Sequence, residues 1–184
     1  MSVQLNNARD PSYFIFSNEK KTPPILLPEQ NEKLQRLFVF LKNLNETTYY
    51  PFLKDLIEKC ESSDNIPAYL ATIKRLELSC CDLQTLPDEI AALSNLEELI
   101  LIKNHLTQLP CNLNSLSHLR FVALQGNRFT QVPPVMCTIA QSRILNKEVF
   151  DLYLAENPMP TIPMKIKEVV RSMPHFSTIF VRQE

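Results

Sequence analysis

The stretch that decides the fold runs from residue 73 to residue 136. It reads IKRLELSCCDLQTLPDEIAALSN (73–95), LEELILIKNHLTQLPCNLNSLSH (96–118) and LRFVALQGNRFTQVPPVM (119–136). The three pieces start at 73, 96 and 119, so the spacing is 23 residues each time. Apolar residues recur at the same places in each piece, and in the second piece these are Leu96, Leu99, Leu101, Leu106, Leu109, Leu113 and Leu116. A single helix or a hairpin cannot satisfy this pattern, whereas a fixed period of such length indicates a solenoid of stacked units.

The shared pattern is L-x-x-L-x-L-x-x-N-x-L-x-x-L-P. It resembles the leucine-rich repeat, a family whose units span about 20–29 residues. The resemblance implies an α/β fold, a leucine-rich repeat solenoid. In this fold each unit adds a short parallel strand to a concave face and returns over the convex side through a turn and a helical segment. Function does not follow from the fold alone.

Two irregular units follow the regular ones. The next matching unit begins at Val149, which is 30 residues after Leu119. The extra length of the unit that begins at Leu119, CTIAQSRILNKE (137–148), contains neither Pro nor Gly and therefore predicts a longer convex helix. A last unit begins at Phe176. We therefore expect leucine-rich repeats over residues 73–184, with five strands.

The part before the repeats is predicted to be an N-terminal arm (residues 1–28) and a helical cap (residues 29–72). Apolar residues at helical spacing predict a helix over 29–45, namely Leu34, Leu37, Phe38, Leu41 and Leu44. A second helix is expected from Pro51 and a short helical turn from Pro67. A cap is physically required, because the terminal unit of a solenoid would otherwise leave its leucine layer and its strand edge open to water.

Composition and charge exclude several classes of function. The 19 basic and 20 acidic residues give a formal net charge of −1, so no basic footprint for nucleic acid is present. No apolar run approaches the roughly 18 residues of a membrane-spanning helix, and the start of the sequence lacks the pattern of a secretory signal. Five cysteines without paired spacing indicate reduced thiols. We therefore expect a cytoplasmic monomer without membrane insertion.

The sequence predicts no catalytic site, no metal site and no cofactor. With Gly126 as the only glycine, a glycine-rich phosphate loop is impossible, and the three histidines lack metal-ligand spacing. An enzyme would have to depend on a polar cluster such as Cys80 with His105, which is the less favoured hypothesis. The asparagines that follow the strands are instead predicted to bond turn backbone groups, and these are Asn104, Asn127 and Asn157. Cys81 takes the same place in the first unit.

Side chains that alternate with the inward leucines are predicted to face the concave surface. The candidate partner-binding residues are Glu77, Glu98, Ile100, Ile102, Lys103, Phe121, Gln125, Asp151, Tyr153 and Phe180. We expect the apolar ones to form a continuous exposed patch with the charged ones at its rim. On this prediction Ile100→Glu or Tyr153→Glu removes a partner without changing the thermal midpoint.

The most favoured function is a protein-protein interaction module that binds a protein partner on the concave face. The chain is similar to short leucine-rich repeat effectors of intracellular bacterial pathogens. This resemblance implies injection into the host cytosol and binding to a host protein or to another effector. Two alternatives remain. Leu27-Pro28-Glu29 before the helices is similar to an F-box, which would make the chain an adaptor that recruits a host ubiquitin ligase. A purely scaffolding role is the other.

Overall fold

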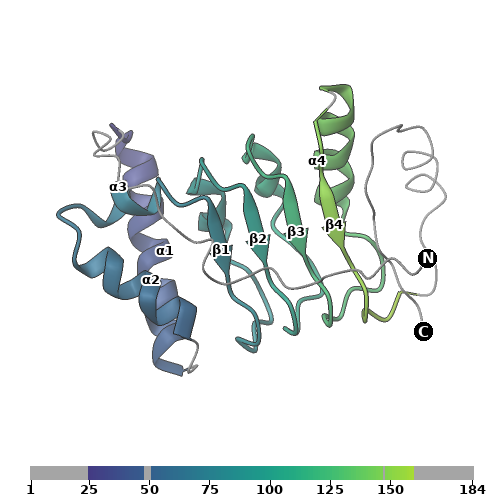
Figure 1. Cartoon of the computed structure of the whole chain (residues 1–184), viewed down its shortest axis with the longest axis horizontal. Helices are drawn as coiled ribbons and strands as arrows, with labels where there is room; N and C mark the ends of the chain where they lie inside the picture. Colours follow the sequence, from purple (N-terminus) through teal and green to yellow (C-terminus); the bar gives the residue numbers. More distant parts are fainter. Residues whose placement is uncertain (1–24, 48–50, 147, 160–184) are drawn as a thin grey trace, which may run out of the picture.

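The computed structural model describes residues 25–47, 51–146 and 148–159. Within them the short strands β1 (Arg75–Glu77), β2 (Glu98–Ile100), β3 (Phe121–Ala123) and β4 (Asp151–Tyr153) form one parallel sheet (Figure 1). Their order in the sheet is their order in the sequence. The predicted α/β solenoid of the leucine-rich repeat type is thus confirmed. The predicted fifth strand, at Phe176 to Val181, lies outside the described residues.

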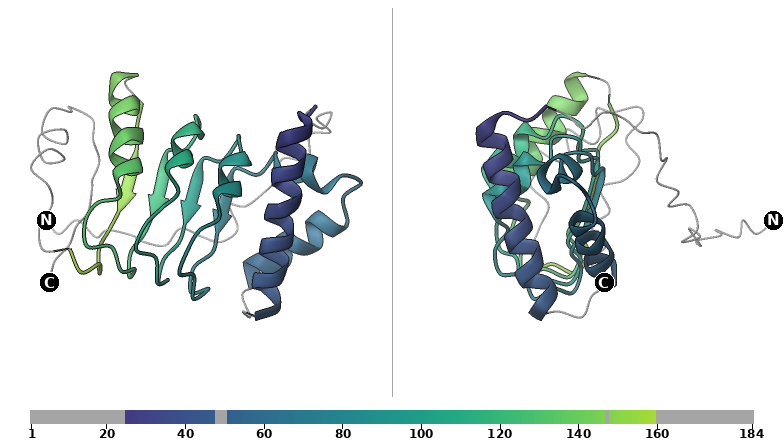
Figure 2. Two further views of the ribbon diagram at one scale, coloured as in Figure 1. Left: turned by 180° about the vertical axis from the view of Figure 1, so that it is seen from behind. Right: turned by 90° about the vertical axis from the view of Figure 1, so that its left-hand side faces the viewer.

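The return segments cover the convex side of the sheet. They are the 3-10 helices η2 (Asp88–Ala92) and η3 (Cys111–Ser115) and the α-helix α4 (Pro134–Leu145), seen from behind in Figure 2. Pro87 and Pro110 stand just before η2 and η3, where a fixed φ near −65° suits the entry to a helical turn. The predicted longer helix is confirmed, because α4 takes up most of the extra length of the third unit, which runs from Leu119 to the residue before Val149.

The core lies between the sheet and the return segments. Successive units bury the same positions, and the middle residues of the strands are stacked in register as Leu76, Leu99, Val122 and Leu152. The residues just after the strands are also buried, namely Leu78, Leu101, Leu124 and Leu154. Full burial of one such side chain contributes roughly 1.5–3 kcal/mol. Each unit therefore draws its stability from its neighbours.

The cap consists of α1 (Pro28–Thr47), α2 (Pro51–Glu61) and α3 (Ile66–Leu70). The buried face of α1 joins the same core through Leu34, Leu37, Phe38 and Leu41, as the sequence predicts. The short helix α3 starts at a capped end, where the Asn65 side-chain oxygen accepts a hydrogen bond from the backbone N–H of Ala68 at 3.0 Å. The helices thus close the N-terminal end of the solenoid, while the division of the chain at residues 28 and 72 stays a prediction.

An asparagine follows each of the strands β2, β3 and β4 and bonds the turn of the unit before it; Asn104 and Asn127 are buried and Asn157 is half-buried. Asn127 donates from Nδ2 to the carbonyl of Leu101 at 2.8 Å and to that of Leu124 at 3.0 Å. Its Oδ1 accepts from the backbone N–H of Leu106 at 3.1 Å. Asn104 and Asn157 repeat this pattern toward the first and third units. The predicted structural role of these asparagines is confirmed.

The residue just before Cys81, Asn104, Asn127 and Asn157 adopts a left-handed backbone conformation in each case. These residues are Cys80, Lys103, Gly126 and Glu156, with φ of 56°, 54°, 65° and 59°. Gly126 is the only glycine among them. A Cβ at this position would come within 3.2 Å of the Lys103 Cγ atom. A side chain at Gly126 would therefore have to displace the Lys103 side chain.

We expect Asn127→Ala to lower the free energy of unfolding by at least about 2 kcal/mol, because it leaves a buried N–H and buried carbonyls without partners. Urea denaturation followed by circular dichroism measures this change. Asn114→Ala is the matched control, since Asn114 lies exposed on η3 and should change the free energy by less than about 0.5 kcal/mol. Equal values for the two variants would contradict a structural role for the buried amide.

Candidate partner-binding face

The strands present a grid of side chains on the face opposite the leucine core. One row across the sheet is Arg75, Glu98, Phe121 and Asp151, and the next is Glu77, Ile100, Ala123 and Tyr153. None of these residues belongs to the contiguous apolar core. The predicted alternation is therefore correct, and it places the strand candidates on one common face. Phe180 lies outside the described residues.

The side chains at the centre of this face are more buried than predicted. Ile100 is only 6% exposed and Ala123 only 1%, whereas Ile102, Phe121 and Tyr153 are half-buried. The expected continuous exposed patch is therefore wrong at its centre. Neighbouring strands lie about 4.8 Å apart, so a residue in the middle of the grid has side chains close on every side. A short apolar side chain at that position is enclosed although it points away from the core.

An aromatic pair occupies the part of the face over β3 and β4. The rings of Phe121 and Tyr153 have centroids 5.1 Å apart and are tilted by 42°. In the register Tyr153 stands opposite Ala123, two residues beyond Phe121, so the two rings meet diagonally between the strands. Such a pair is worth about 0.5–1.5 kcal/mol beyond the burial of its area. The contact holds two large aromatic side chains at a fixed place on the face.

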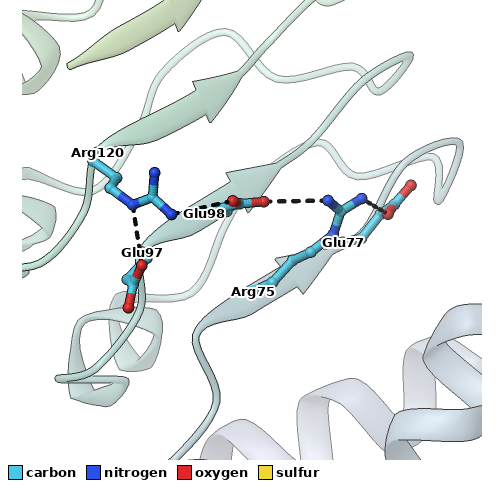
Figure 3. A network of polar contacts seen from close by, with 5 residues as sticks. All are labelled: Arg75, Glu77, Glu97, Glu98 and Arg120. Atoms are coloured by element: carbon cyan, nitrogen blue, oxygen red, sulfur yellow. Dashed lines mark hydrogen bonds and ion pairs between the residues drawn. The ribbon is translucent and has the colours of Figure 1, made fainter. Parts of the chain in front are cut away.

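A network of ion pairs occupies the part over β1 and β2, and Figure 3 shows most of it. Arg75 contacts Glu77 at 2.7 Å and Glu98 at 3.2 Å. Arg120 reaches Glu98 at 3.7 Å and Glu97 at 3.0 Å. Lys74 completes the chain of contacts with Glu97 at 2.7 Å. The predicted rim charges Glu77 and Glu98 are thus already paired with arginine.

Sequence reasoning missed this network, although the sequence contains a signal for it. Lys74, Glu97 and Arg120 are spaced by 23 residues, so they occupy the same place in three successive units with alternating sign. Stacking brings such positions together, and opposite charges at one period are therefore a direct indication of inter-unit ion pairs. Neither Glu97 nor Arg120 was among the predicted site residues.

The remaining candidates lie at the margins of the face. Lys103 is exposed in the turn after β2, and its backbone N–H donates to the carbonyl of Gln125 at 2.8 Å. Gln125 is half-buried, and its Oε1 has no hydrogen-bond partner. Asp151 is half-buried beside Phe121 in the register. These residues surround the aromatic pair on the turn side and along β4.

No group of three or more His, Cys, Asp or Glu residues gathers as a metal site within the described ranges. Burial raises the pKa of the Cys60 thiol to about 12, which disfavours a thiolate. His105 lies 3.4 Å from the exposed Asp82 carboxylate, which makes it part of a surface pair. In the described part of the chain no helix is long and apolar enough to cross a bilayer.

We expect Ile100→Glu to lower the free energy of unfolding by at least about 2 kcal/mol, because the carboxylate would be enclosed beside Glu77 and Glu98. Ile102→Glu is the matched control, since it makes the same change two residues further along the chain, just after β2, at a half-buried position. It should cost less than half as much. Thermal and urea denaturation measure both values. A large loss of stability in the Ile102→Glu variant with none in the Ile100→Glu variant would contradict the burial described above.

The network makes a pH-dependent contribution to stability through Glu97. The hydrogen bond from Lys74, followed by that from Arg120, holds the pKa of the Glu97 carboxyl below its ordinary value, against the opposing effect of burial. A lowered pKa stabilises the fold above the ordinary value of about 4.3, and this contribution is lost as the pH falls through the folded value.

We therefore expect Glu97→Gln to cost about 1 kcal/mol at pH 7 and the difference from the unchanged chain to shrink toward zero near pH 3. Denaturation midpoints at both pH values test this. Glu58→Gln removes a single exposed helical ion pair with Lys54 and serves as the control with a smaller effect. A difference that grew toward low pH would contradict the sign of the pKa shift.

Comparison with known proteins gives limited similarity. Neither the family models nor the curated proteins contain a match to this chain. Among solved structures, a leucine-rich repeat protein of Leptospira interrogans is similar over 54% of this chain, at 30% sequence identity and a TM-score of 0.45. The chain covers 24% of that protein. The assignment of the fold therefore rests on the register of the parallel strands and on the asparagines that bond successive turns, both described above.

Proposed function

We propose that the chain is a protein-binding module that holds a protein partner on its concave face. The observation that carries this proposal is the grid of side chains on one side of the parallel sheet, outside the leucine core, with the Phe121–Tyr153 pair fixed on it. The strand register and the ring contact hold these side chains in place before a partner arrives. Preorganisation of this kind lowers the entropy lost on binding.

The two halves of the face would contribute differently to affinity. Truncation of an aromatic anchor at the centre of an interface costs about 2 kcal/mol or more, and Phe121 and Tyr153 are the aromatic side chains on these strands. The charges of Arg75, Glu77 and Glu98 already satisfy one another and would act mainly on the association rate and the orientation of the partner. We therefore place the main binding energy over β3 and β4.

The biological setting is a finer part of the proposal. The 23-residue L-P repeat with a helical cap resembles short effectors of intracellular bacterial pathogens, so we propose an effector that acts in the host cytosol on a host protein or on another effector. We propose a binding role for the concave face and no enzymatic activity.

A second candidate surface is the helical cap. Val39 on α1 and Phe52 on α2 are large apolar side chains that are 55% and 57% exposed. An F-box-like adaptor would use such a helical surface to recruit a ubiquitin ligase. This alternative predicts that the cap, and not the concave face, determines recovery of the partner.

Photo-crosslinking followed by calorimetry tests the proposal. A benzophenone side chain at Gln125 should capture a protein from host-cell lysate, whereas the same group at the convex Asn114 should not. With the identified partner purified, Phe121→Ala and Tyr153→Ala should each weaken binding at least about tenfold, which corresponds to 1.4 kcal/mol. Asn114→Ala is the control with unchanged affinity. If both aromatic variants bind normally and Val39→Glu does not, the partner binds the cap.

A further inference from the structure

Two cations at one edge of the solenoid form no ion pair within the described part of the chain. Lys103 lies in the turn after β2, and Arg128 lies directly after the turn that follows β3. Both side chains are exposed. Every other lysine and arginine within the described ranges forms an ion pair. Because the turns after β2 and β3 stand side by side (Figure 1), the stacking of the units brings these two cations to the same edge.

The Lys103 side chain runs from its own turn toward the next one. A Cβ at Gly126 would lie 3.2 Å from the Lys103 Cγ atom, so the stem of the lysine crosses the glycine. The lysine backbone is held there as well, because its N–H donates to the carbonyl of Gln125 at 2.8 Å. Arg128 follows Gly126 by two residues, and its N–H donates to the carbonyl of Leu106 at 2.9 Å. Both cations therefore belong to the edge around Gly126.

The carboxylates near this edge compensate the two cations only in part. Asp82 lies in the turn of the first unit, where it is 3.4 Å from His105, and the lysine stem points away from that unit. Glu156 lies on the other side of Gly126, with its Oε2 atom 3.5 Å from the position of a Cβ. Within the described residues no ion pair joins Glu156 to either cation. Around Gly126 two positive charges thus stand against one carboxylate.

The distance from this edge to the aromatic pair is set by the strand register. Tyr153 stands opposite Ala123, and Gly126 follows Ala123 by three residues. At about 3.3 Å per residue, the edge lies roughly 10 Å from the aromatic pair. An extended segment of a partner that lies along the face covers this distance in about three residues.

Charge and distance together define the partner segment. Arginine and lysine both donate to a carboxylate, and the guanidinium can do so through two parallel hydrogen bonds. One excess positive charge suits a single carboxylate and not the row of phosphates of a nucleic acid. We propose, given a protein partner on the concave face as proposed above, that Lys103 and Arg128 bind an acidic side chain of that partner. This side chain follows or precedes, by about three residues, the apolar one that lies on Phe121 and Tyr153.

Nitrogen-edited NMR of the full chain tests this with the peptide acetyl-Phe-Ala-Ala-Glu amide as the probe. Saturable shift changes are expected at the backbone amides of residues 103 and 121–128, with a dissociation constant on the order of 1–10 mM. The same peptide with Gln in place of Glu should bind at least about threefold more weakly. Added salt should weaken the Glu peptide more than the Gln peptide, because ions screen exposed charges.

Variants of the chain complete the test. Lys103→Gln and Arg128→Gln should each weaken binding of the Glu peptide at least about threefold. Glu156→Gln should instead strengthen it about twofold, because it removes a like charge beside Gly126. Lys54→Gln is the matched control, since it removes an exposed lysine on α2 and should leave binding unchanged. The unaffected remainder of each spectrum verifies that the variants fold.

Equal binding of the Glu and Gln peptides, or a Glu156→Gln variant that binds the Glu peptide more weakly, overturns the acidic contact. Shift changes confined to residues 121–125 overturn it too, but they leave the binding face in place. The proposed function is tested separately, by crosslinking and by the aromatic variants with a whole partner, so its failure is distinct from these outcomes.

Discussion

The asparagine amide that follows each of the strands β2, β3 and β4 is the interaction on which the rest of the structure depends. A strand of three residues followed by a sharp turn leaves backbone groups that face the leucine layer and cannot reach water. Asn104, Asn127 and Asn157 each pair such groups on the turn before them. The leucine core can then remain apolar up to the turn, and the distance between units is set by the reach of one side chain.

The regular spacing of the units converts sequence position into position on the surface. Residues 23 apart become lateral neighbours, and for this reason Lys74, Glu97 and Arg120 form one row of alternating charge. The same rule brings Phe121 beside the fourth unit, where the longer return through α4 changes the spacing in sequence but not the register in the sheet. The concave face is thereby divided into a part with compensated charges and a part with aromatic side chains.

The sequence predicts features that recur with the period and fails for features that do not. The strands, the asparagines and the longer convex helix all follow from the spacing of Leu, Asn and Pro residues. The alternation of side chains also predicts the face on which Ile100 lies. It does not predict how buried Ile100 is, because burial depends on the side chains of the adjacent strands. The contact between the cap and the repeats has no periodic signal at all, since Gln30 at the start of α1 donates to the carbonyl of Ala92, 62 positions later. Contacts of that kind require the three-dimensional structure.

The asparagine bonds have a direction, because each asparagine amide bonds the turn of the preceding unit. The first unit has no preceding unit, and it has Cys81 at this position in place of an asparagine. A ribosome delivers the chain from its N-terminus at about 5–20 residues per second. Each turn must therefore wait about one to five seconds until the next 23 residues have emerged with the asparagine that completes it. During synthesis the helical cap and the turns already completed stand behind a single open turn, so the growing chain exposes unpaired backbone groups at only one advancing edge.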